Sequence, residues 1–114
     1  MKWGEIWSVA GGGDNGQPRP AVILQDDLFD AIESVTICAF TSDPTPAPLF
    51  RLEVLPSLTN GLKGTSRLMV DKITTVHKAK IGARIGVLDE EDGVRLDRAV
   101  LVFLGLAASR RSRR

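Results

Sequence analysis

The sequence is poor in cysteine, histidine and aromatic residues, and each shortage removes a class of function. Cys38 is the only cysteine, so an intramolecular disulfide is impossible, and Cys38 with the single histidine, His77, cannot supply a zinc site. The aromatic residues are Trp3, Trp7 and four phenylalanines, which leaves few rings for stacking on bases. We expect Cys38 to be a small buried hydrophobic residue.

Long apolar runs are also missing. Residues 1–10 contain no apolar segment of a secretory signal, and the longest apolar stretch, residues 99–108, is interrupted by Gly105 and covers about half of a membrane span. We therefore expect a cytoplasmic protein without a membrane segment. A length of 114 residues fits one globular domain, which we assign to residues 1–109.

Charge is nearly balanced overall but unevenly distributed. The formal net charge is +1, yet residues 51–84 hold seven Lys or Arg against two Asp or Glu, and residues 89–97 hold five carboxylates. Residues 110–114 hold four arginines and are expected to form a basic disordered tail. This asymmetry favours a polyanion or an acidic peptide as a partner.

Periodic apolar residues predict short strands followed by one helix. The expected strands cover residues 5–9, 21–24, 34–40, 50–54, 66–76 and 84–88. Residues 11–16 are expected to form a flexible glycine loop, residues 43–48 an extended proline-rich connection, and residues 59–64 a turn with Asn60-Gly61 as its tight point.

The helix is predicted to start at Asp89, a candidate N-cap followed by acidic residues that suit the first turn. Gly93 inside it indicates a close contact with a neighbouring element. The apolar stripe of this helix consists of Leu96, Ala99, Val100, Phe103 and Leu104. Together these elements predict a mainly β fold, a small SH3-like half-open antiparallel barrel with a C-terminal helix packed on it.

Several enzyme classes are excluded by missing motifs. The sequence has no P-loop, no G-x-G-x-x-G, no H-E-x-x-H and no G-x-S-x-G, and one histidine rules out paired-imidazole catalysis. An enzyme built on this chain depends on Arg, Thr, Ser, Asp or Lys. RNA suits these groups, because its own 2′-hydroxyl can attack the adjacent phosphate once a protein aligns the two and stabilises the developing charge.

Arg19 and Thr41 are the strongest candidates for such a site. Arg19 lies between Pro18 and Pro20 at the start of an apolar strand, and its planar guanidinium can bind a phosphate with two hydrogen bonds. Thr41 ends the next apolar strand, where its hydroxyl can face a cleft, and Ser42 is a weaker candidate of the same kind. The structural alternatives are a surface arginine beside a loop and a β-branched strand residue.

Asp71 and His77 add a carboxylate and an imidazole in the basic segment. Asp71 is predicted in the middle of a strand, and its structural alternative is an ion pair with Lys72 or Arg67. His77 has the alternative of a surface histidine at a strand end.

The order of these motifs resembles the MazF/PemK family of toxin endoribonucleases. The similarity extends over residues 2–106, including the last helix. Thr74 stands where the family often has an arginine, His77 where it has an acid, and Met69 where PemK-type members have an arginine. The matching segments are Gly4-Glu5-Ile6-Trp7, Arg19-Pro20-Ala21-Val22-Ile23, Phe40-Thr41-Ser42, Asn60-Gly61-Leu62 and Val70-Asp71-Lys72-Ile73-Thr74-Thr75.

The resemblance implies a PemK/CcdB-like barrel and a metal-independent, sequence-specific endoribonuclease without a cofactor. Its substrate would be single-stranded RNA, either mRNA or tRNA or rRNA, cut to a 2′,3′-cyclic phosphate and a 5′-hydroxyl. A homodimer and a small acidic, MazE-like antitoxin are also implied. The residues implied to be catalytic are Arg19, Thr41 and Asp71. Those implied to bind RNA are Asn15, Gln17, Ser42, Lys72, Thr74 and His77.

Two other functions stay open at this level. A CcdB-type toxin on the same barrel poisons a topoisomerase without cleaving anything, and an RNA-binding module would bind RNA without activity. The combination of Arg19 with Thr41 favours the nuclease.

Overall fold

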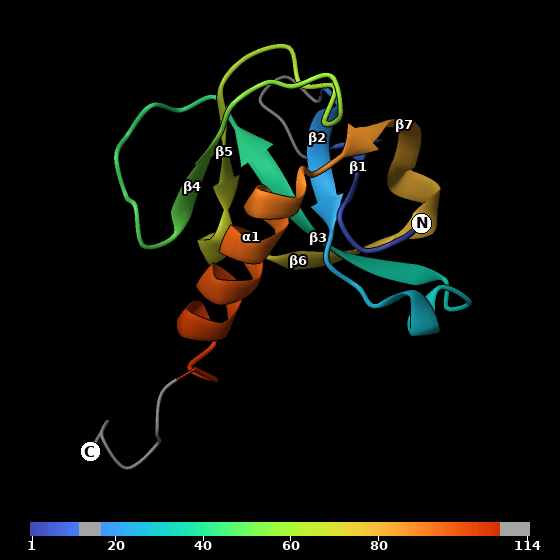
Figure 1. Ribbon diagram of the computed structural model, residues 1–114. Coiled ribbons are helices and arrows are strands. Elements are labelled where there is room, and N and C mark those ends of the chain that lie inside the picture. Colours follow the sequence, from blue (N-terminus) through green and yellow to red (C-terminus); the bar gives the residue numbers. More distant parts are fainter. Residues whose placement is uncertain (12–16, 108–114) are drawn as a thin grey trace.

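The computed structural model describes residues 1–11 and 17–107, which form a curved antiparallel sheet with one α-helix against it (Figure 1). The elements are β1 (Glu5–Val9), β2 (Arg19–Ile23), η2 (Asp27–Phe29, a 3-10 turn), β3 (Ser34–Thr41), β4 (Arg51–Val54), β5 (Ser66–Met69), η3 (Val70–Lys72), β6 (Thr74–His77), η4 (Lys78–Lys80), β7 (Ile81–Val87) and α1 (Glu90–Phe103). Strands pair in the order β4-β5-β3-β2-β1-β7, and β6 also pairs with β3. The predicted half-open architecture is confirmed, since the described end strands β4 and β7 do not pair with each other.

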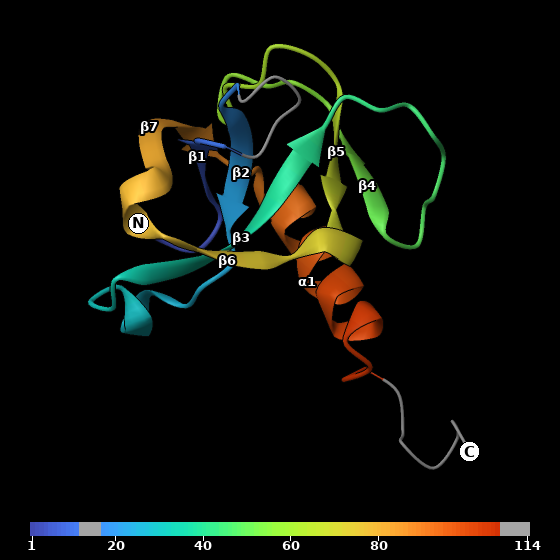
Figure 2. The ribbon, with the colours of Figure 1, turned by 180° about the vertical axis from the view of Figure 1, so that it is seen from behind.

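Both faces of the sheet carry buried side chains, because successive residues of a strand point to opposite faces. In Figure 1 α1 crosses in front of the sheet, and in Figure 2, seen from behind, β6 lies in front. The cluster under α1 includes Ile6, Val22, Cys38, Phe40, Leu68, Leu96 and Ala99. The cluster on the opposite face consists of Val9, Ala21, Ile23, Val35 and Ile37. β2 and β3 therefore lie in the middle of the core, which gives the residues at their ends a rigid support.

Two buried small residues behave as predicted. Cys38 is fully buried, and burial, helped by the charge of Asp71, raises the pKa of its thiol to about 12. Gly93 packs on Trp3, where an added Cβ would stand 3.4 Å from the ring.

Residues 66–76, predicted as one strand, form two strands separated by the turn η3. β5 pairs with the end of β3, with Leu68 opposite Phe40, whereas β6 pairs with its first half, with Thr74 opposite Ile37. The break follows from tertiary contacts, because Val70 is fully buried and its N–H donates to a carbonyl near the start of β4. Local alternation in the sequence gives no sign of these contacts.

The predicted turn of residues 59–64 lies within the loop of residues 55–65, with Gly61 in the left-handed conformation at φ 67°. The side chain of Asn60 is fully buried inside that loop. The Oδ1 atom of Asn60 accepts from the N–H groups of Ser57 (2.9 Å) and Leu62 (3.0 Å), and its Nδ2 donates to the carbonyl of Leu55 (2.9 Å). Asn60 thus organises the backbone of this loop through its side chain, which the sequence pattern did not indicate.

Helix α1 forms where predicted, with two differences. Asp89 occupies the N-cap position without a side-chain bond to the helix, and its carboxylate accepts instead from the hydroxyl of Ser57 at 2.6 Å. Leu96 and Ala99 of the predicted stripe are buried, but Phe103 and Leu104 are 47% and 54% exposed, because the last turn extends past the sheet (Figure 1). Among the described residues, no helix is long and apolar enough to cross a membrane.

Candidate active site

The strand register brings Arg19 of β2 and Thr41 of β3 together. The printed pairing of β2 with β3 ends at Ala21 opposite Ala39, and beyond this pair Arg19 and Thr41 line one small space at the strand ends. We call the small space between these strand ends the β2–β3 hollow, and its volume is about 170 Å³. It is lined by Arg19, Pro20, Phe40, Thr41, Ser42 and Ser66. Three of the predicted site residues, Arg19, Thr41 and Ser42, are therefore neighbours.

The hydroxyl of Thr41 is fixed by the turn that follows β3. Its Oγ1 accepts a hydrogen bond from the N–H of Asp43 at 3.2 Å, which leaves the hydroxyl hydrogen for another acceptor. Asp43 in turn accepts from the hydroxyl of Thr45 at 2.7 Å and from its N–H at 2.9 Å, and these bonds lower the pKa of Asp43. The turn holds the end of β3 in one conformation.

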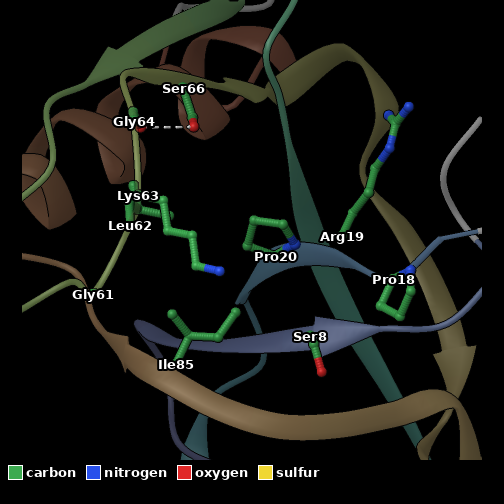
Figure 3. A pocket seen from close by; sticks show the side chains of 10 residues that line it. All are labelled: Ser8, Pro18, Arg19, Pro20, Gly61, Leu62, Lys63, Gly64, Ser66 and Ile85. Carbon is green, nitrogen blue, oxygen red and sulfur yellow. Dashed lines mark hydrogen bonds between the residues drawn. The ribbon is translucent and has the colours of Figure 1, made fainter.

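A larger pocket of about 440 Å³ adjoins the β2–β3 hollow, and Figure 3 shows the residues that line it. Lys63 extends into this pocket toward Pro20 and Ile85, whereas the side chain of Arg19 extends away from Lys63 (Figure 3). The size is that of a small-ligand site. Arg19 thus stands at the boundary between the pocket and the β2–β3 hollow.

Asp71, predicted in the middle of a strand, lies in the turn η3 and pairs with Arg51 of β4. The Nε–Oδ1 distance is 2.7 Å and the Nη2–Oδ2 distance 3.0 Å, so the two groups share two parallel hydrogen bonds. The ion-pair partner is thus neither of the two residues expected from the sequence. Hydrogen bonding to Arg51 lowers the pKa of Asp71 and raises that of Arg51. Asp71 does not line the β2–β3 hollow.

Arg51 was not identified from the sequence, and the register explains its place. Arg51 stands opposite Met69, the position where PemK-type members carry an arginine. The arginine beside Asp71 therefore comes from the adjacent strand. Only a known pairing of β4 with β5 could have indicated it.

Arg67 is a second arginine near the site for which the sequence predicted no role in the reaction. It stands opposite Thr41 on one side and opposite Glu53 on the other. Its Nη2 donates to the Oε2 of Glu53 at 2.9 Å, and its Nη1 to the carbonyl of Asp43 at 3.4 Å. The side chain of Glu53 is 51% exposed, so solvent screens this pair and its contribution to stability is about 0–1 kcal/mol.

The residues predicted to bind RNA are dispersed. Gln17 is exposed just before β2, and Lys72 and Thr74 are exposed at η3 and β6, outside the β2–β3 hollow. Asn15 and the basic tail of residues 110–114 lie outside the described residues.

His77 ends β6 and has a structural environment. Its Nδ1 accepts from the N–H of Ala79 at 3.1 Å, which caps the turn η4, and its Nε2 lies 3.9 Å from the carboxylate of Glu33. Across residues 1–11 and 17–107, no group of three or more His, Cys, Asp or Glu is placed to hold a metal ion.

Residues 2–104 match the family described as PemK-like, MazF-like toxins of type II toxin–antitoxin systems. The chain belongs to this family. One MazF-like relative, the probable endoribonuclease MazF of Mycolicibacterium smegmatis, is 49% identical over 108 residues, which cover 94% of this chain and 99% of the relative. The family predicted from the motifs is confirmed, and the predicted enzyme class is the one that this relative's name gives.

Solved structures of MazF-like proteins share the fold. An endoribonuclease in complex with its cognate antitoxin, from a mycobacterial species, has a TM-score of 0.75 at 19% identity and covers 93% of this chain and 96% of that chain. MazF from Deinococcus radiodurans also has a TM-score of 0.75, at 16% identity, with 92% and 96% covered. At these identities the comparison shows the MazF-like arrangement of sheet and helix and nothing about individual site residues.

Proposed function

We propose that this MazF-like toxin is a metal-independent, sequence-specific endoribonuclease that cleaves single-stranded RNA in the cytoplasm. The observation that carries the proposal is the β2–β3 hollow, which Arg19 and Thr41 both line. The 2′-hydroxyl loses its proton to solvent as its oxygen attacks the adjacent phosphorus, and the bond to the 5′-oxygen breaks as that oxygen takes up a proton from solvent. The products are a 2′,3′-cyclic phosphate and a 5′-hydroxyl.

Arg19 stabilises the charge that develops during this attack. The non-bridging oxygens of the five-coordinate phosphorus carry more negative charge than those of the starting phosphate, and a guanidinium can donate two hydrogen bonds to them. Pairing of Arg19 with Val9 and the proline on either side hold its backbone before RNA arrives. Such a preorganised donor needs little rearrangement in the transition state.

The hydroxyl hydrogen of Thr41 is not used in the bond from Asp43, and it forms a hydrogen bond with the phosphate or with the 2′-oxygen. Asp71 is poorly suited to accept the proton of the 2′-hydroxyl, because both of its oxygens bind Arg51 and its pKa is lowered. We therefore propose that Arg19 and Thr41 contact the reacting group, and that Asp71 holds β4 and β5 together beside it.

Cleavage in the presence of excess EDTA is the experiment that tests the proposed function. We expect long single-stranded RNA to be cut at defined sequences, because RNA supplies the nucleophile and Arg19 the positive charge. The new ends should be a cyclic phosphate and a 5′-hydroxyl that a kinase can label. Loss of activity on chelation, restored by magnesium, would contradict the mechanism. Binding without cleavage would identify an RNA-binding module, and the absence of both would favour a CcdB-type topoisomerase poison.

Replacing Thr41 by alanine is expected to lower the cleavage rate about 10²-fold, as for the loss of one donor to a developing anion. Thr41→Ser keeps the hydroxyl and should recover most of the rate, and Ser42→Ala should have a smaller effect. Single-turnover cleavage of a labelled RNA measures all three. Equal, small effects of Thr41→Ala and Ser42→Ala would assign both residues to structure.

We also propose a homodimer that is inhibited by a small acidic, MazE-like antitoxin. Apolar side chains at the end of α1 are exposed, and pairing with a second copy would cover them. The positively charged segment of residues 51–84 attracts an acidic peptide as well as RNA. One similar solved structure contains an endoribonuclease with its cognate antitoxin.

Light scattering and an inhibition assay test these two proposals separately. We expect the mass of a dimer at assay concentration, and inhibition by a peptide rich in Asp, Glu and apolar residues. The inhibition should weaken as salt rises, because the attraction is largely electrostatic. A monomer that cleaves RNA would contradict the dimer, and cleavage unaffected by acidic peptides would contradict the electrostatic part of the antitoxin proposal.

A further inference from the structure

One row of side chains crosses four neighbouring strands at the proposed active site. Thr41 of β3 pairs with Arg67 of β5, and Arg67 pairs with Glu53 of β4. Continuing the β2–β3 register adds Arg19 at the other end of the row. Figure 2 shows the same strands, β2, β3, β5 and β4, side by side. Residues opposite each other on paired strands share a face, so Arg67 lies on the face of Thr41, two strand spacings or about 10 Å from Arg19.

The guanidinium of Arg67 is bound weakly enough to exchange its partner. It has one bond to an oxygen of the half-exposed Glu53 and one long bond, 3.4 Å, to the carbonyl of Asp43. The two arginines are similarly buried, with Arg67 19% and Arg51 16% exposed, but the pair of Arg51 and Asp71 has two short bonds and its carboxylate is only 23% exposed. Of these two arginines, Arg67 is therefore the one whose carboxylate partner an incoming anion can displace.

The surface beside Arg67 is hollowed. A cleft of about 300 Å³ has Pro46 and Pro48 in its wall and Arg67 and Arg95 among its polar residues. The prolines restrict the backbone of this wall, and Glu53 is the carboxylate that lines the cleft. Arg67 and Glu53 both line this cleft, so an anion bound to Arg67 would lie at the cleft.

We propose that Arg67 is a second phosphate-binding residue, which holds the phosphate next to the scissile one while Glu53 occupies it in the absence of RNA. This inference rests on the proposed endoribonuclease function. The RNA runs from Arg19 across β3 and β5 toward the cleft at β4, and its phosphate replaces the carboxylate of Glu53 on the guanidinium. Glu53 then moves into solvent, where it is already half exposed.

Binding of a non-cleavable RNA tests the inference. The cut site is first mapped on long RNA with the wild-type protein, and a short strand with a 2′-deoxy nucleotide at that site is then titrated at several salt concentrations. Arg67→Ala should raise the Kd about tenfold and lower the slope of log K against log salt by about 0.7, the loss of one phosphate contact on a single strand. Glu53→Gln should bind RNA about three- to fivefold more tightly, because its carboxylate no longer competes.

Arg98→Ala is the matched control, since it removes the same charge from an exposed position on α1 and should leave Kd and slope unchanged. Wild-type Kd and slope in Arg67→Ala overturn the inference, and so does weaker binding by Glu53→Gln. If circular dichroism shows that Arg67→Ala is unfolded, Glu53→Gln decides alone. A wild-type protein that neither binds nor cleaves RNA contradicts the proposed function as well, whereas cleavage with an unchanged Arg67→Ala contradicts only the second phosphate site.

Discussion

Arg19→Ala should cleave RNA about 10²–10³-fold more slowly than the wild-type protein while keeping its fold. We propose that the guanidinium of Arg19 binds the oxygens of the five-coordinate phosphorus. Neither a water molecule nor Lys63, across the adjoining pocket, would hold a positive charge at the same fixed position. The effect should fall mainly on kcat, because the interaction strengthens as charge develops on the phosphate. Binding of uncleaved RNA should change less than the rate.

Two further variants separate position from charge. Arg19→Lys keeps the charge but loses the planar pair of donors, so its rate should lie between those of wild type and Arg19→Ala. Arg98→Ala loses one exposed charge on α1 and should cleave normally. Single-turnover rates, with circular dichroism to check folding, measure these differences. A folded Arg19→Ala protein that cleaves RNA at the wild-type rate would place the active site elsewhere.

Gly86→Ala is expected to lower the free energy of unfolding by about 3 kcal/mol or more. A Cβ on Gly86 would lie 2.5 Å from the carbonyl oxygen of Asn60 and 2.6 Å from that of Thr59. Both contacts are to backbone, and Asn60 is held by buried hydrogen bonds, so the loop cannot move aside cheaply. The total stability of a domain this small is about 5–15 kcal/mol, so the loss is large.

Gly64→Ala is the matched control in the same loop region, because a Cβ there would meet nothing within 4 Å. Its effect on stability should stay within about 0.5 kcal/mol. Urea unfolding of both variants gives the comparison. Gly86→Ala should also slow RNA cleavage, since the loop it displaces carries Lys63 and the other residues that line the large pocket. Equal stabilities of the two variants would show that the loop yields to the added methyl group.

Local patterns were sufficient for most of the strands, the helix and the motif residues. Residues 5–9 alternate between polar and apolar, and an apolar run follows Arg19. Both patterns are visible from neighbouring residues alone, and both segments form strands. Alternation failed at residues 66–76, where the buried Val70 and the pairing of β5 and β6 with different parts of β3 divide the segment. The turn at residues 59–64 was expected, but not the bonds by which the buried amide of Asn60 holds its backbone.

The sequence by itself determined the family, the mainly β fold with its C-terminal helix, and Arg19 and Thr41 as candidates, because these depend on composition, short-range periodicity and short motifs. Only the tertiary structure decided that Arg19 and Thr41 line the same hollow, that Asp71 binds Arg51, and that Arg67 stands between Thr41 and Glu53. All three depend on the register of strands that are distant in the chain. A shift of one residue in that register would turn each of these side chains to the opposite face of the sheet.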